Sequence, residues 1–233
     1  MPHTPLQHAR ATSGCEPHPA RRDFSNFVES PAFPCVGAKS ANSRNRLRCS
    51  VFDKLGTEAA TQRLWRELQT FSEEHPDPGL VPVSFAAVFL DDAGDAPSFH
   101  DRLWRQLQLL HEWDACNFDW APGVSADPSA SDFSFSVARR AFFVVGLHPR
   151  SARLARRAPH PTLVFNFHDQ FEAMKAAGLY QKLQRTIRAR DIALQGDVNP
   201  SLTDFGLGSE ARQYSGHLAG GCPFHARKRV DHA

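Results

Sequence analysis

Side chains that bind ions or move protons are concentrated between residues 141 and 222. Two short apolar runs, residues 141–147 and 162–167, are each followed at once by a histidine, His148 and His168. The same region contains further groups of this kind among apolar residues: His160, His217, Asp169, Glu172, Asp191, Glu210, Tyr214 and Cys222. Because such groups are costly to bury without partners, their placement indicates a binding or catalytic site.

The elements that position these groups can be predicted from the apolar pattern. The two runs are short and rich in β-branched and aromatic residues, which predicts buried strands, and ligand sites of α/β domains favour strand ends. Residues 47–53 and 81–90 have strand patterns too. Helical patterns follow the Thr57 cap, begin at Pro97, and cover residues 170–177 and 180–194. This alternation predicts a mixed α/β (α+β) fold in a single domain, with a small central sheet flanked by helices.

Composition sets the outer limits of the prediction. Residues 1–22 are rich in Pro, His, Ala and Arg and are expected to form a disordered tail, residues 23–224 the domain, and residues 225–233 a basic tail. The net charge of +2 gives no reason to expect nucleic acid or membrane as partner. No apolar run approaches the roughly 18 residues of a membrane span. Five scattered cysteines and the lack of an apolar leader predict reduced thiols and a cytoplasmic protein.

Several longer motifs carry a resemblance to a known family. They are FPCVGAKSA at 33–41, LWRQLQLLHEWD at 103–114, FFVVGLHPRSARLARR at 142–157, PTLVFNFHDQFE at 161–172, IRARDIALQGDVNPSLTDFG at 187–206, and SEARQYSG with CPF near the C-terminus. In these motifs and their order the chain resembles the YqcI/YcgG family over roughly residues 24–224. That family includes heme-dependent N-hydroxylases of the guanidino group of arginine and arginine-derived compounds, one branch serving guanitoxin biosynthesis.

The resemblance implies a heme b monooxygenase that uses dioxygen. The sequence has no GxGxxG fingerprint and no room for a reductase domain, so the electrons must come from an external donor. The other expected partner is a small guanidino substrate, and the sequence leaves a homodimer open.

Heme iron is usually held by histidine, cysteine, methionine or tyrosine. His111 is the first candidate, because it lies on a predicted helix face beside Trp104 and Leu107, where Asp114 is able to fix its tautomer. His148 at a strand end is the second candidate, and Cys35, His168 and Cys222 remain as further ones.

The full set of expected roles follows from the motifs and from the resemblance. Carboxylates are the natural partners of a planar, permanently charged guanidinium. The expected catalytic residues are His168, Asp169 and Glu172; the expected heme-binding residues are His111, His148, Trp104, Cys35, Arg153 and Arg157; the expected substrate-binding residues are Asp191, Glu210, Asn199 and Tyr214. Each acid also has a structural alternative, such as capping a helix or pairing with a nearby arginine.

Two other functions fit the same residues. The first is a heme-binding or heme-sensing protein without turnover. The second is a non-heme iron oxygenase in which His148, His168 and a carboxylate hold the metal. A heme absorption band would exclude the non-heme iron oxygenase, and formation of a hydroxylated product would exclude a heme-binding protein without turnover.

Overall fold

A five-stranded mixed sheet forms the centre of the molecule, which we describe from a computed structural model. The structure describes residues 18–197, 199, 208–217 and 222–226. The strand order is β1-β2-β5-β4-β3, with bounds β1 Leu47–Phe52, β2 Ser84–Phe89, β3 Phe135–Val137, β4 Arg140–Leu147 and β5 Thr162–Phe167. β1 and β2 are parallel, and the other neighbours are antiparallel. The predicted mixed fold, a single domain with a small central sheet flanked by helices, is confirmed.

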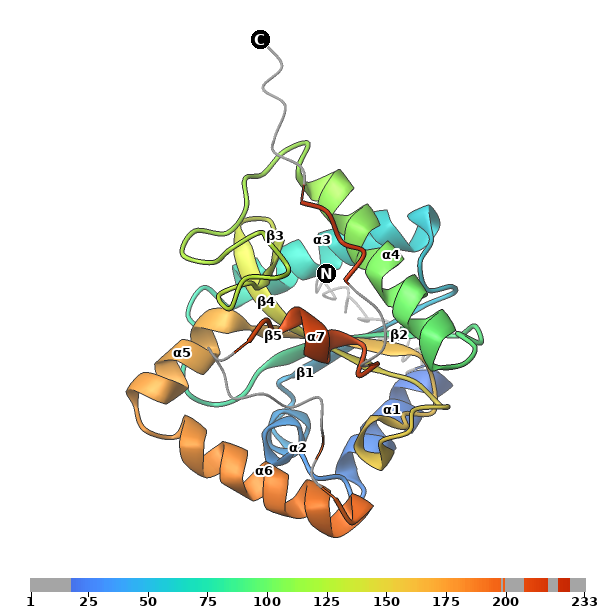
Figure 1. Cartoon of the computed structure of the whole chain (residues 1–233), viewed down its shortest axis with the longest axis vertical. Helices are drawn as coiled ribbons and strands as arrows, with labels where there is room; N and C mark the ends of the chain where they lie inside the picture. Colours follow the sequence, from blue (N-terminus) through green and yellow to red (C-terminus); the bar gives the residue numbers. More distant parts are fainter. Residues whose placement is uncertain (1–17, 198, 200–207, 218–221, 227–233) are drawn as a thin grey trace, which may run out of the picture.

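Helices cover both faces of this sheet (Figure 1). The helices are α1 Pro19–Glu29, α2 Val36–Ser43, α3 Glu58–Glu74, α4 Ala96–Asp114, α5 His168–Ala176, α6 Tyr180–Gln195 and α7 Ala211–Tyr214, with a short 3-10 turn, η1, at Leu154–Arg156. α3 and α4 pack on one face, whereas α1 and α2 pack on the other and α6 lies outside α2. None of the helices in the described ranges is long and apolar enough to cross a membrane.

The period of two along β2 explains why the sheet has a core on each face. Phe85, Ala87 and Phe89 belong to the large core under α3 and α4, and Ala86 and Val88 belong to the smaller core under α1. All six residues of β2 are buried. A strand buried on both faces is apolar throughout, which is why it could be recognised in the sequence.

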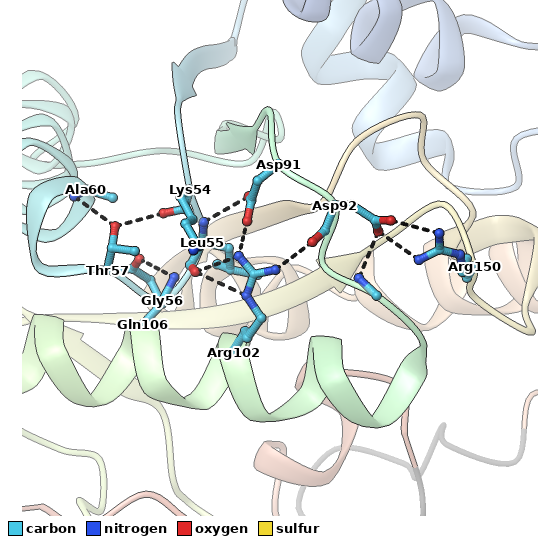
Figure 2. A network of polar contacts seen from close by, with 11 residues as sticks. Lys54, Leu55, Gly56, Thr57, Ala60, Asp91, Asp92, Arg102, Gln106 and Arg150 are labelled. Atoms are coloured by element: carbon cyan, nitrogen blue, oxygen red, sulfur yellow. Dashed lines mark hydrogen bonds and ion pairs between the residues drawn. The ribbon is translucent and has the colours of Figure 1, made fainter.

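Arg102 on α4 fixes this helix to the loops that follow β1 and β2 (Figure 2). Its guanidinium donates to the carbonyl oxygens of Leu55 (2.9 Å) and Asp92 (2.8 Å) and pairs with the carboxylate of Asp91. The Asp92 carboxylate in turn accepts two hydrogen bonds from Arg150, at 2.7 and 2.8 Å. These contacts join the loops that follow β1, β2 and β4 to one another and to α4.

The structure differs from the sequence predictions at the N-terminal part of the domain. α1 begins at Pro19, inside the segment predicted as a tail, because Ala20 is buried against the sheet and the His18 side chain caps the helix. Residues 36–43 form α2, a helix that the sequence patterns above did not predict. An eight-residue helix offers little periodicity to detect, and tertiary packing decides its conformation. At the C-terminal boundary, residues 227–233 of the predicted basic tail lie outside the described residues.

Candidate functional site

An apolar cavity of about 250 Å³ lies between the sheet and the helices α1, α2, α5 and α6. Its size is close to the lower end of the range for small-molecule pockets, roughly 300 to 1,000 Å³. Its walls come from the face of β4 and β5 that carries Phe143, Val145 and Val164, and from apolar side chains of the surrounding helices. Such a lining is suited to a flat, apolar ligand.

Cys35 is the N-cap residue of α2 and lines this cavity. Its Sγ accepts a hydrogen bond from the backbone N–H of Ala38 at 3.4 Å. Burial raises the pKa of the Cys35 thiol, while the backbone N–H groups of Ala38 and Gly37 partly offset this effect. Such donors at a helix N-terminus stabilise a thiolate, and a bound metal ion removes the thiol proton outright.

The segment before Cys35 is held by two cationic side chains. Lys39 Nζ donates to the carbonyl oxygen of Ser30 at 2.6 Å. Arg190, which comes from α6, donates to the carbonyl oxygens of Pro31 (2.9 Å) and Phe33 (3.2 Å). Because these bonds come from two helices, they fix the position of the loop that leads to Cys35.

Asp191 on α6 contributes a carboxylate to the cavity wall. It is only 5% exposed, and its Oδ2 lies 2.6 Å from the guanidinium of Arg153. Arg153 also pairs with Asp197, two residues beyond the end of α6. The second oxygen, Asp191 Oδ1, is buried and has no hydrogen-bond partner among the described residues. A buried carboxylate oxygen in this state is costly unless a ligand donates to it.

Arg156 places a positive charge on the same wall. Its guanidinium donates to the carbonyl oxygens of Gly146 (3.3 Å), Tyr214 (3.1 Å) and Gln213 (2.7 Å) and forms no ion pair in the part of the chain that the structure describes. Burial lowers the pKa of Arg156 to about 10, so this group still carries its charge at neutral pH. It is placed to face an acidic group of a ligand.

The chain matches the family model described as the YqcI/YcgG family over residues 24–225. It belongs to the YqcI/YcgG family. This match covers the domain from α1 to the last described segment and confirms the resemblance carried by the sequence motifs. Searches among curated proteins and among solved structures give no match.

In this YqcI/YcgG chain, the first iron-ligand candidate, His111, lies on the opposite face of the sheet from the cavity. It is buried on α4, and its ring is 5.4 Å from those of Trp120 and Phe224. Asp114, expected to fix its tautomer, instead accepts from Trp65 Nε1 at 2.6 Å and from a backbone N–H at 2.8 Å. His111 therefore has a core environment and does not line this cavity.

Trp104 and Tyr214 are likewise part of the core on the α4 side. Their rings stack at 5.6 Å with an angle of 16°. The Tyr214 hydroxyl joins β3 to β4, since it accepts from Phe135 N at 3.2 Å and donates to Phe142 O at 3.1 Å. Tyr214 thus holds the C-terminal segment against the sheet edge, and neither ring lines the cavity.

His148 and His168 are at opposite ends of the sheet. β4 and β5 are antiparallel, with Leu147 paired to Thr162 and Phe142 paired to Phe167. These two pairs are five residue steps apart along β4, about 17 Å, and each histidine lies one residue beyond its own end of the sheet. The two histidines therefore do not share a metal ion, and no three His, Cys, Asp or Glu side chains come together as a metal site in the described ranges.

His148 has an apolar environment of its own. Its ring stacks on Phe99 at 4.5 Å, and its buried Nδ1 has no hydrogen-bond partner among the described residues. Burial lowers its pKa to about 4, with smaller contributions from the positive charges of Arg156 and Arg150. The ring is neutral at physiological pH and lines no part of the cavity.

His168 belongs to a polar cluster at the start of α5. Its Nδ1 lies 2.7 Å from the hydroxyl of Ser134, which is also 3.1 Å from Glu210 Oε2. Burial raises the pKa of Glu210 to about 7 and lowers the pKa of His168. The two neighbouring acids on α5 are exposed: Asp169 pairs with Arg140 at 2.7 Å, and Glu172 with Lys175 at 2.8 Å. The three expected catalytic residues are thus together, but none of them lines the cavity.

Three of the other predicted site residues line the cavity: Asn199, Asp191 and Cys35. Arg153 contacts it indirectly, through its ion pair with Asp191. Arg157 is exposed and donates a hydrogen bond to Ser151 O.

Sequence reasoning missed Arg156, because a 3-10 turn gives no pattern that tells which of its arginines faces inward. It also missed Asn166, whose Oδ1 accepts from Ser84 at 2.7 Å in the cavity wall. The period of two in residues 162–167 places Asn166 on the same face as Val164, and this signal was sufficient to find it.

Proposed function

We propose that this protein is a heme-dependent monooxygenase that hydroxylates a guanidino nitrogen of arginine or an arginine-derived compound, using dioxygen and external electrons. The observation that carries the proposal is one cavity lined both by Cys35, a residue type that can hold heme iron, and by Asp191, whose buried Oδ1 has no partner among the described residues. Family membership adds the guanidino chemistry as an expectation.

The residues of the cavity fit a heme group. Of the side-chain types that hold heme iron, only Cys35 and Met174 line the cavity in the described ranges. Cys35 is the better ligand because its sulfur becomes a thiolate, and its position is fixed by α2, Lys39 and Arg190. The remaining walls are mostly apolar and would pack against a porphyrin, and Arg156 would neutralise a propionate or a substrate carboxylate.

The protein's own part in the reaction begins with substrate binding. Asp191 Oδ1 accepts a hydrogen bond from the substrate guanidinium, while Arg153 holds Oδ2 and so fixes the plane of the carboxylate. The apolar walls exclude water, which strengthens this ion pair. A heme bound at Cys35 supplies dioxygen activation. Overall, one oxygen atom enters the new N–O bond and the other leaves as water, with two electrons and two protons consumed.

The first experiment is reconstitution of the purified chain with hemin. We expect a Soret band, a different or lost band in Cys35→Ser, and an unchanged band in the control Cys222→Ser, whose thiol packs against the core of α3 and α4. Thermal unfolding of each variant shows that it is folded. A Soret band that Cys35→Ser leaves unchanged contradicts the ligand assignment.

The second experiment tests turnover. Arginine is incubated with the reconstituted protein, dioxygen and a chemical reductant, and mass spectrometry is used to look for a product heavier by one oxygen atom. Heme binding without any such product from arginine or agmatine favours the non-catalytic heme-binding alternative. No heme binding at all rejects the proposed function.

A further inference from the structure

We propose that the outer face of α6 is the docking surface for a small acidic electron-transfer protein. The inference rests on the proposed function, because the proposed reaction takes its electrons from an external donor. Of the described helices, α6 combines a wall of the cavity with an exposed face that carries only positive charge.

The inner face of α6 lies against the proposed iron site. Leu183, Ile187 and Asp191 are spaced by four residues, and all three line the cavity. Leu183 Cδ2 and Cys35 Sγ both lie within 4 Å of one point, the position of a β-carbon added at Gly37. The outer face of α6 is therefore one helix away from the thiol, which gives a short path for an electron.

The outer face of α6 has a basic centre and apolar ends. Leu179, at its N-cap, and then Lys182, Arg185, Ala189 and Ile192 are exposed and follow one another at spacings of three or four residues, so they form one stripe. Leu179 is 43% exposed and Ile192 41%. Neither Lys182 nor Arg185 forms an ion pair with a described residue.

α6 has an excess of positive charge, whereas positive and negative charges nearly balance over the whole chain. The helix contains four basic residues, Lys182, Arg185, Arg188 and Arg190, and one acid, Asp191, which faces inward and pairs with Arg153. The whole sequence has a net charge of only +2. A local excess of positive charge over a redox site attracts an acidic partner and steers it to the correct face.

The type of surface also agrees with a transient electron-transfer contact. Such complexes have small interfaces, form and separate quickly, and depend more on electrostatic steering than on buried area. The exposed leucine and isoleucine at the two ends of the stripe add apolar contact around the charged centre. This arrangement favours a partner with acidic residues around an exposed redox centre.

The test compares heme reduction in the full-length holoprotein with a plant-type [2Fe–2S] ferredoxin, kept reduced by its NADPH-dependent reductase, as the donor. The test variant is Lys182→Glu/Arg185→Glu. The matched control is Arg66→Glu/Arg105→Glu, which reverses two exposed charges on α3 and α4, across the sheet from α6. The rate of ferrous heme formation is measured by anaerobic stopped flow at low and high salt.

We expect the test variant to be reduced about tenfold or more slowly than wild type at low salt, with the difference shrinking at high salt as charges are screened. The control should stay within about twofold, and dithionite should reduce all three proteins equally. Equal ferredoxin rates in the test variant and wild type overturn the inference, as does a wild type reduced by dithionite but not by ferredoxin. A chain that binds no heme rejects the proposed function as well, so the two failures are distinguishable.

Discussion

Replacing Asp191 with asparagine isolates the charge that we assign to substrate binding. The amide has nearly the same shape as the carboxylate and still offers an oxygen to Arg153, so the cavity keeps its form. What is lost is the negative charge that faces the cavity through Oδ1, the atom without a partner among the described residues. The substitution therefore affects a guanidinium much more than a neutral ligand.

The size of the effect follows from hydrogen bonds to charged groups, which contribute roughly 1.5–3 kcal/mol. At about 1.4 kcal/mol per tenfold change in affinity, Asp191→Asn should raise the Kd for arginine by about 10- to 150-fold. The same substitution weakens the buried ion pair with Arg153, where Nη2 lies 2.6 Å from Oδ2. Because Arg153 keeps Asp197 as a second partner, the loss of stability should be below the roughly 3–5 kcal/mol for breaking a fully buried pair.

The control is Asp197→Asn. Asp197 also pairs with Arg153, but it is outside the cavity and its side chain is 68% exposed. Calorimetric titration of the holoprotein with arginine measures both Kd values, and thermal unfolding measures both stabilities. We expect a large rise in Kd for Asp191→Asn alone. Equal affinity in wild type and Asp191→Asn, or an equal loss in both variants, would refute the role of the Asp191 charge.

Two further predictions concern stability. Glu210 has a pKa of about 7 in the folded protein against 4.5 as its ordinary value, so the folded state keeps the proton longer and stability falls as pH rises from about 4.5 to 7. Glu210→Gln should remove this fall and stabilise the protein above pH 7 by on the order of 3 kcal/mol. The free energy of unfolding is measured with urea at pH 5 and pH 8, and an equal change between the two pH values in variant and wild type contradicts the prediction. Gly146→Ala places a β-carbon 2.5 Å from Leu103 Cδ1 and 2.9 Å from Tyr214 O. It should cost roughly 1–3 kcal/mol or more, whereas Gly37→Ala, with contacts of 3.8 Å and longer, should not lower the Tm.

The elements with strong local signals were predictable from the sequence. β5 has the bounds of the apolar run at residues 162–167, and Thr57 caps α3 through a bond from Ala60 N, as the cap residue and the spacing predict. α6 begins at Tyr180 as expected and ends one residue beyond Leu194. In each case a short window of residues contains both the boundary and the period, so no tertiary information was needed.

The site was harder to predict because it depends on how strands pair. The sequence shows that His148 and His168 each follow a strand, and parallel strands would have brought them to one edge. Because β4 and β5 are antiparallel, the two histidines lie at opposite ends of these strands. The same limit applies to helix faces: the apolar stripe of α4 places His111 toward the sheet, but the pattern does not tell which face of the sheet has a cavity.

The environments of the four candidate acids explain why Asp191 is the one we assign to the guanidinium. Asp169 and Glu172 are on the exposed side of α5 and already have cationic partners within 3 Å. Glu210 is buried, but its raised pKa keeps part of its population neutral at pH 7, and its oxygen contacts Ser134 outside the cavity. A permanently charged guanidinium gains most from an acid that burial has separated from water and that still has one oxygen to offer. Within the described ranges, Asp191 meets both conditions, because Arg153 holds one of its oxygens and leaves the other without a partner in the cavity wall.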